Sequence, residues 1–173
     1  MSGAVPVYMM PRRNARGIIG PVPLSEMTPE AILKKIADNP LIEDKKGKPP
    51  ALAALTNSTY DGLCYHIRQT TAELSRTVPR IHYDEAWYAY ARFNPLYEGR
   101  YGMHRGERHP DDATVTVTHS THKCLAALSQ ASMIHIRSGK VPVNPTLFNE
   151  AFMMHTSTSP QYSIIASTDV AAK

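Results

Sequence analysis

The amino-acid sequence predicts an α/β protein with a mostly parallel sheet flanked by helices. Short runs of apolar and β-branched residues alternate along the chain with longer segments of helical periodicity. The chain has 173 residues, 42% of them hydrophobic, which is enough for one domain with its own core. We therefore expect a single layered domain rather than a helical bundle or a repeat array.

The first expected elements are a strand and a capped helix. VPVYMM, residues 5–10, predicts a strand, and a passage rich in Gly and Pro follows it. Thr28, Pro29 and Glu30 predict a helix start, because a hydroxyl caps free amides, proline fits the first turn, and an acid favours the positive end of the helix dipole. We expect this helix to end before Pro40.

The remaining elements continue the alternation. Further strands are expected at 51–57, 80–87, 114–119 and 132–137, and further helices at 65–77, 145–154 and 159–172. The longest expected loop covers residues 94–112, and loops of that length are typical of functional or mobile segments.

Charge and cysteine content narrow the class of function. The net charge is +4, but the basic residues form two separate clusters, at 12–16 and 45–48, without interleaved aromatic residues. We therefore do not expect nucleic-acid binding. Because no apolar run approaches about 18 residues, we expect no membrane span. Two cysteines form no disulfide framework and indicate a reducing compartment, so the cytoplasm is the expected location.

Chemically useful side chains stand where two of the expected strands end. RIHYD ends in Asp84, and TVTVTHSTHK ends in Ser120, His122 and Lys123. Ligands of open parallel sheets bind at the carboxyl ends of the strands, so we expect these side chains to share one edge. The apolar run 125–128 is expected to anchor them by burial.

An acid and a lysine at such an edge suit pyridoxal phosphate. This cofactor needs an amine for its aldehyde, a carboxylate that keeps its ring nitrogen protonated, and donors for its phosphate. Lys123 suits the first role, Asp84 the second, and Ser120 with His122 the third. If the strand continues past Asp84, Ala86 faces the same side and is small enough for the ring to lie flat over it.

Each of these residues also has an ordinary explanation. A lysine after a strand is most often a surface residue, and an aspartate at a strand end is most often a turn former. His119 and His122 form an H-x-x-H pair, which fits zinc only with a third ligand in a matching context. The other histidines show no recognisable spacing, and we expect no metal site.

Five longer segments resemble one family. HSTHKCLAALSQASMIHI resembles the cofactor-lysine segment of the bacterial Orn/Lys/Arg decarboxylases, which are fold-type-I, aminotransferase-like pyridoxal phosphate enzymes. The likeness continues through RNARGIIGP, TNSTYDGLCY, HYDEAWYAYARFNPLY and FNEAFMMHTSTSPQYSIIAS, in the right order. The resemblance implies that residues 1–173 are the central portion of the cofactor-binding major domain.

The same resemblance implies a role for each candidate residue. Lys123 would form the internal aldimine with pyridoxal phosphate, and Asp84 would pair with the pyridine nitrogen. Ser120 and His122 would contact the phosphate, while Trp87 would lie beside the ring. The implied reaction is decarboxylation of a basic amino acid to the corresponding amine and CO2.

The family builds its active sites across a dimer interface. Ser157 matches a position that reaches the phosphate of a neighbouring subunit's cofactor, with His155 and Thr158 as supporting residues. The resemblance thus implies a homodimer with shared active sites and, in many members, decamers. The residues of segments 119–123 and 84–97 resemble the arginine and lysine branches of the family more than the ornithine branch, so arginine or lysine is the expected substrate.

The chain is shorter than the family's enzymes. We expect the amino-terminal wing domain, the phosphate-cup segment and the C-terminal domain to lie outside it. Two hypotheses follow. The 173 residues are either a segment of a decarboxylase or a truncated, catalytically inactive relative that acts as a partner of full-length subunits. In both cases we expect these residues alone to have little or no decarboxylase activity.

Overall fold

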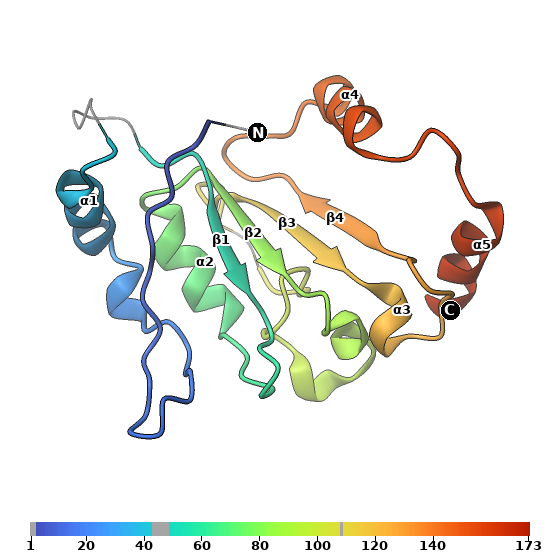
Figure 1. Ribbon diagram of the computed structural model, residues 1–173, viewed down its shortest axis with the longest axis horizontal. Helices are drawn as coiled ribbons and strands as arrows, with labels where there is room; N and C mark the ends of the chain where they lie inside the picture. Colours follow the sequence, from blue (N-terminus) through green and yellow to red (C-terminus); the bar gives the residue numbers. More distant parts are fainter. Residues whose placement is uncertain (1–2, 43–48, 108) are drawn as a thin grey trace.

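Four strands form one sheet in the order β1-β2-β3-β4 in the computed structural model, which describes residues 3–42, 49–107 and 109–173 (Figure 1). The strands are β1 (Ala53–Thr56), β2 (Arg80–Asp84), β3 (Thr114–His119) and β4 (Met133–Arg137). The first three run parallel, and β4 is antiparallel to β3. The predicted fold class, a mostly parallel sheet flanked by helices, is confirmed.

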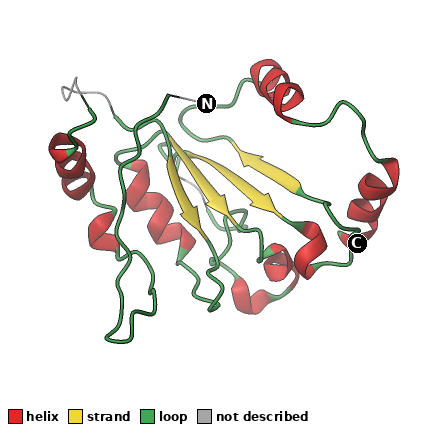
Figure 2. Cartoon of the chain, in the orientation of Figure 1, coloured by secondary structure: helices red, strands yellow, loops and turns green. Residues whose placement is uncertain are grey.

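Helices alternate with these strands (Figure 2). The α-helices are α1 (Pro29–Asp38), α2 (Ile67–Ser75), α3 (Thr121–Cys124), α4 (Pro145–His155) and α5 (Tyr162–Ala171), and the 3-10 helices are η1 (Leu24–Glu26), η2 (Ala89–Phe93) and η3 (Pro95–Tyr97). The predicted start of α1 is confirmed, since the Thr28 hydroxyl accepts a hydrogen bond of 3.2 Å from the amide of Ala31. The second basic cluster, 45–48, lies outside the described residues.

Two strand predictions differ from the structure. Residues 5–10 form no strand, because the amide of Met10 bonds the Glu26 carboxylate at 2.8 Å instead of a neighbouring strand. The strand predicted over 80–87 ends at Asp84. The Oδ1 atom of Asp84 accepts a hydrogen bond of 3.1 Å from the Ala86 amide, and the chain turns at this point. Ala86 is therefore a turn residue and not a strand residue.

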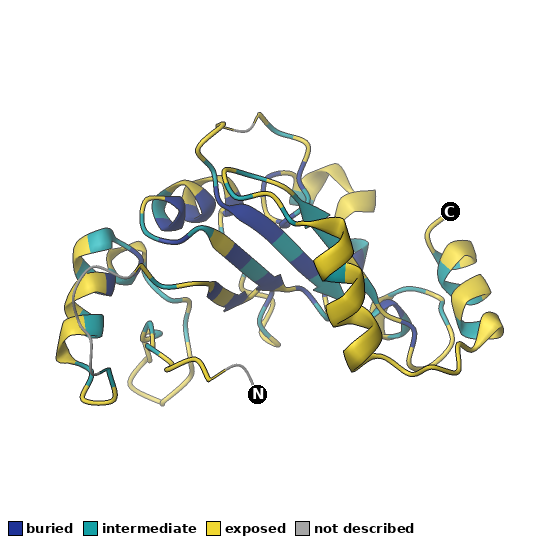
Figure 3. Ribbon diagram, turned by 90° about the horizontal axis from the view of Figure 1, so that it is seen from above, coloured by how far each residue is buried: buried dark blue, intermediate teal, exposed yellow. Residues whose placement is uncertain are grey.

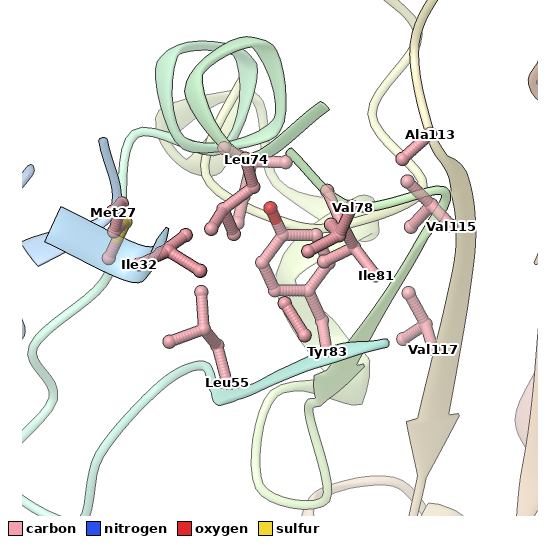
Figure 4. Packing of buried hydrophobic residues seen from close by; sticks show 12 residues of the cluster. Met27, Ile32, Leu55, Leu74, Val78, Ile81, Tyr83, Ala113, Val115 and Val117 are labelled. Atoms are coloured by element: carbon pink, nitrogen blue, oxygen red, sulfur yellow. The ribbon is translucent and has the colours of Figure 1, made fainter. Parts of the chain in front are cut away.

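The core lies on one face of the sheet. Leu55, Ile81, Tyr83 and Val117 point from the strands toward α2 and are buried (Figure 4). Inside this core the hydroxyls of Tyr83 and Thr71 are 3.0 Å apart, and burial raises the pKa of the tyrosine. The β-sheet alternation places the next residues in sequence on the opposite face.

That opposite face is polar and open. Ala54, Thr56 and Asp84 are exposed on it, and His82 bonds Thr116 at 2.9 Å. Figure 3 shows the buried residues concentrated in the strands and α2, whereas α4 and α5 are exposed.

No helix in the described part of the chain is both long and apolar enough to span a bilayer. Within these ranges no three His, Cys, Asp or Glu side chains gather as a metal site would require. The cytoplasmic location stays a prediction.

Candidate active site

The carboxyl ends of β2 and β3 lie side by side. Asp84, the last residue of β2, is in register with Thr118 of β3. Ser120 follows β3 directly, and α3 then carries His122 and Lys123. The structure therefore brings the acid and the lysine segment to one edge of the sheet, as the strand-end rule predicted.

Asp84 presents its carboxylate on the open face of the sheet. It is exposed, and within the described part of the chain its side-chain hydrogen bond is the one from the Ala86 amide to Oδ1. Its backbone carbonyl accepts a hydrogen bond of 2.8 Å from the amide of Asn57, which extends the pairing with β1. The backbone is thus fixed, while Oδ2 is left for an external donor.

Lys123 lies over the ring of Trp87. Its Nζ is 4.9 Å from the ring centroid, within the range of a cation–π contact. Tyr60 also lies beside this indole, with the two ring centroids 5.0 Å apart. Because Trp87 stands three residues after Asp84, this contact joins the segments that follow β2 and β3.

His122 and Ser120 hold the short helix in place. The Nδ1 of His122 donates a hydrogen bond of 2.8 Å to the carbonyl of Ala131, since a carbonyl can only accept, and Nε2 is left for another partner. The Ser120 hydroxyl does not cap α3, although its carbonyl accepts the amide of Lys123 at 2.9 Å. Among the described residues, one hydroxyl and one imidazole nitrogen thus remain at this edge for a ligand.

The predicted apolar anchor at 125–128 is wrong. Leu128 is 53% exposed, and only Leu125 and Ala127 are half-buried. The helix ends after one turn at Cys124, and Leu125 is extended, so the apolar run never turns onto the core. The flanking residues Thr121 and Ala131, which are 0% and 1% exposed, anchor the segment instead.

Sequence reasoning missed a buried carboxylate, Glu85, and its hydrogen-bond donors, which lie on the core face of the sheet next to the candidate site. Glu85 lies on the face toward α2, opposite to the face that carries Asp84, and is 1% exposed. Its carboxylate accepts hydrogen bonds from Asn57 Nδ2 at 2.7 Å, the Gly102 amide at 2.7 Å and His119 Nε2 at 3.1 Å. The available signal was a charged residue at a buried position of the strand alternation. We call these four residues the Glu85 cluster.

A small cavity adjoins the cluster. It has a volume of about 140 Å³, and Arg92, Tyr101, Met103, His119 and His135 are among its lining residues. The rings of the two histidines are 5.0 Å apart. Burial lowers the pKa of His135, and the neighbouring His119 lowers it further, so His135 favours its neutral form.

Ser157 lies apart from these groups. It stands on the exposed segment between α4 and α5, where its hydroxyl accepts a hydrogen bond of 3.1 Å from the Ser159 amide. His155 donates from Nδ1 to the Ala151 carbonyl at 2.8 Å. The structure does not bring Ser157 to Lys123, and its role toward a neighbouring subunit stays a prediction.

Fold and site together define a class of protein, an α/β domain that presents an acid and a lysine at the ends of adjacent parallel strands. Residues 1–173 match the family described as Orn/Lys/Arg decarboxylase, major domain, and the chain belongs to this family. The predicted family resemblance is confirmed.

Curated relatives include decarboxylases of all three basic amino acids. The chain is 54% identical to the biodegradative arginine decarboxylase of Escherichia coli over 174 residues and 54% identical to the lysine decarboxylase LdcA of Pseudomonas aeruginosa over 173 residues. Each match covers 99% of this chain and 23% of the relative. An ornithine decarboxylase of Haemophilus influenzae is 34% identical over 180 residues, which cover 99% of this chain and 24% of that protein.

The solved structure of lysine decarboxylase A from Pseudomonas aeruginosa has the same fold. It matches with a TM-score of 0.91 at 54% identity, over 99% of this chain and 23% of that one. The chain thus spans about a quarter of the length of the relatives it matches, and its fold is the fold-type-I-like one of lysine decarboxylases.

Proposed function

We propose that these residues form the central, cofactor-binding part of a pyridoxal phosphate-dependent decarboxylase of basic amino acids. The observation that carries this proposal is the placement of Asp84 and Lys123 at the carboxyl ends of neighbouring parallel strands. Family membership supports the same reaction class, since the relatives are decarboxylases of arginine, lysine and ornithine.

The donor set at this edge fits the cofactor. Pyridoxal phosphate, when bound, supplies an aldehyde and an electron-accepting ring. The amine of Lys123 would hold the aldehyde carbon, and the exposed carboxylate of Asp84 would hold a proton on the ring nitrogen. The Ser120 hydroxyl and Nε2 of His122 would bind the phosphate, and Trp87 would lie beside the ring.

Three further features suit the residues to these roles. Ala86 carries only a methyl group where the chain turns after Asp84, so it leaves room for a flat ring. Asp84 and Lys123 stay in place because their backbones belong to the sheet and to the α3 turn. With the cofactor bound and a substrate amine in place of Nζ, the Lys123 amine would be free to hold a proton and deliver it to the α-carbon after CO2 has left.

Arginine or lysine is the proposed substrate. Identity to the arginine and lysine enzymes is 54%, against 34% to the ornithine enzyme. We further propose a homodimer in which Ser157 reaches the phosphate of the partner's cofactor, with decamers as a higher assembly. The exposed position of Ser157 leaves its hydroxyl accessible to a second subunit.

Borohydride reduction tests the lysine assignment. The natural polypeptide that contains these residues is loaded with pyridoxal phosphate, reduced, digested and mapped by mass spectrometry. We expect the label on Lys123. Lys140, which also follows a strand, is the internal comparison, and a label there would overturn the assignment.

Release of CO2 tests the reaction and the substrate. We expect turnover of arginine or lysine by the natural polypeptide, slower turnover of ornithine, and little or none by the 173 residues alone. The native subunit mass decides between the two hypotheses. A subunit several times heavier than 19.2 kDa supports the enzyme, and a subunit of that mass favours an inactive partner of full-length subunits.

A further inference from the structure

Glu85 is a buried carboxylate that the proposed chemistry does not use. It follows Asp84 in sequence, yet it lies on the opposite face of the sheet and is 1% exposed. A buried carboxylate is strongly unfavourable unless several donors compensate for its lost hydration. Glu85 accepts from three donors, so the surrounding structure is organised around it.

The donors come from three different segments of the chain. Asn57 follows β1, Gly102 belongs to the loop 94–112, and His119 is the last residue of β3. The Glu85 amide also donates to the Thr118 carbonyl at 3.0 Å. One side chain therefore joins the carboxyl ends of all three parallel strands and the loop beneath them.

Gly102 allows the loop to approach this closely. A Cβ atom at this position would overlap Cγ2 of Val117 and would lie 3.2 Å from Cδ2 of Tyr83. Without a side chain, the Gly102 amide reaches Oε1 of Glu85 at 2.7 Å. The loop backbone is thus a fixed part of the Glu85 cluster.

The hydrogen bond between Glu85 and His119 links the two halves of the candidate active site. Glu85 is the residue directly after Asp84, and His119 is the residue directly before Ser120 and the α3 turn. The contact of 3.1 Å between His119 Nε2 and Glu85 Oε2 lies on the core face of the sheet. It therefore restrains the spacing between Asp84 and Lys123 from the side of the sheet opposite to Asp84. Trp87 contacts Lys123 separately, at the edge.

We propose that Glu85 and His119 are positioning residues for the cofactor-binding pair Asp84 and Lys123. This proposal rests on the proposed function and deepens it. Both side chains are largely buried, on the face of the sheet opposite to Asp84. Their hydrogen bond sets the separation of the Asp84 carboxylate and the Lys123 amine, and with it the alignment of any ligand held by both.

The test uses the natural polypeptide and the substitution Glu85→Gln. The glutamine keeps the volume but removes the charge of the shared acceptor, and the atom that faces His119 changes from an acceptor oxygen to an N–H donor, so the hydrogen bond from His119 to Glu85 cannot form as in wild type. We expect a fall in kcat of about 10- to 100-fold, the effect typical of a slightly misplaced catalytic group, with KM changed by less than about threefold. Glu73→Gln, which removes a surface ion pair with Arg76, is the matched control and should leave both constants unchanged.

Two substitutions of His119 separate positioning from simple stability. His119→Gln keeps an N–H donor for Glu85 and should retain most of the wild-type kcat. His119→Phe removes the donor and should match Glu85→Gln, and the double variant should be no worse than either single one. If all these variants melt earlier but keep wild-type kcat and pyridoxal phosphate affinity, the residues are only structural and the proposal is overturned.

Hydrogen exchange of the cofactor-free protein gives a readout that is independent of activity. In Glu85→Gln we expect faster amide exchange in 84–87 and 119–124 than in wild type, with exchange in α1 unchanged. Equal exchange in both segments would overturn the proposal. If the wild-type protein binds no pyridoxal phosphate, the proposed function fails, whereas this comparison still decides whether Glu85 restrains the two segments.

Discussion

Two regions of this protein both contain apolar side chains but differ in how far those side chains are buried. The packed body, which comprises the sheet with α1 and α2, buries Ile67, Ile81 and Val117 completely. The C-terminal pair, which comprises α4 and α5, buries no residue, and its Phe152 and Ile165 are 45% and 56% exposed. Both regions contain large apolar side chains, and what differs is how far those side chains are covered by neighbouring residues.

The C-terminal pair shows what local sequence can do with little such cover, because it buries no residue, although the Ser167 hydroxyl of α5 accepts a hydrogen bond of 3.0 Å from the Leu128 amide. Asn144 caps α4 by accepting hydrogen bonds from the amides of Thr146 and Leu147, and Pro145 fits the first turn. These signals are enough to start a helix, but most helix stability in proteins comes from packing one face. For the 173-residue chain, the comparison therefore predicts that substitutions in the body affect global stability and those in the pair do not.

The largest expected effect comes from truncating isoleucine in each region. Ile81→Ala removes a side chain that is 0% exposed from the centre of the core, and should lower the free energy of unfolding by about 2–5 kcal/mol. Ile165→Ala in α5 removes a 56% exposed side chain and should change it by less than about 0.5 kcal/mol. Urea denaturation of the two variants measures both. Equal losses would show that α5 is packed in solution.

A glycine at the junction of the two regions gives the next effect. A Cβ on Gly139, which follows β4, would overlap the backbone carbonyl oxygen of Asp112. Because backbone on both sides must move, Gly139→Ala should destabilise the body by about 1–3 kcal/mol. Gly20→Ala is the control, since its Cβ would be 3.4 Å from the Arg12 carbonyl, an ordinary contact. Thermal unfolding of the two variants should separate them, and equal melting temperatures would contradict the packing at Gly139.

Buried His104, whose carbonyl accepts a hydrogen bond of 3.1 Å from Arg137 of β4, makes the body sensitive to acid. Burial lowers its pKa from 6.5 to about 4, and the charges of Arg137 and Arg68 act in the same direction. The unfolded chain binds this proton below pH 6.5 and the native protein only near pH 4. The contribution of His104 therefore lowers the free energy of unfolding as pH falls from 6.5 to about 4, by up to about 1.4 kcal/mol per pH unit. Below about pH 4 this group causes no further loss.

The substitution His104→Asn tests this dependence. Its side-chain oxygen can still accept the Gly106 amide, which now bonds His104 Nδ1 at 3.1 Å, but it binds no proton in this range. Urea denaturation at pH 7, 5.5 and 4.5 should show a flatter profile than wild type. His155→Asn, at the exposed end of α4, is the matched control in the C-terminal pair. A profile parallel to wild type in His104→Asn would contradict the assignment.

The comparison also explains which parts of the fold could be predicted from sequence. Local signals predicted the start of α1 at Thr28 and the bounds of β3, because caps and β-branched alternation act within a few residues. The strand at 5–10 and the buried run 125–128 were wrong predictions. In both segments the outcome depends on a distant partner, which an apolar pattern does not specify.

The candidate site divides in the same way. The strand-end rule predicted that Asp84 and Lys123 share an edge, because parallel strands place their carboxyl ends together. The partners of Glu85 could not be predicted, since Asn57 and Gly102 are 28 and 17 residues away and the path of the loop 94–112 carries no periodic signal. The need for glycine at position 102 also could not be predicted, because it arises from the close approach of Val117, a residue of a different segment.

The smallest expected effect distinguishes the regions through their helix caps. Thr28→Ala removes the cap of α1, whose Ile32 packs into the core, so unfolding should become easier by about 1 kcal/mol. Asn144→Ala removes the same kind of cap from α4, and the midpoint of urea denaturation should not move. Instead the lost hydrogen bonds should raise amide exchange at Thr146 and Leu147 severalfold, because a helix without a packed face opens locally rather than with the whole protein. A shift of the global midpoint by Asn144→Ala would show that α4 unfolds together with the body, and the separation of the two regions would then be wrong.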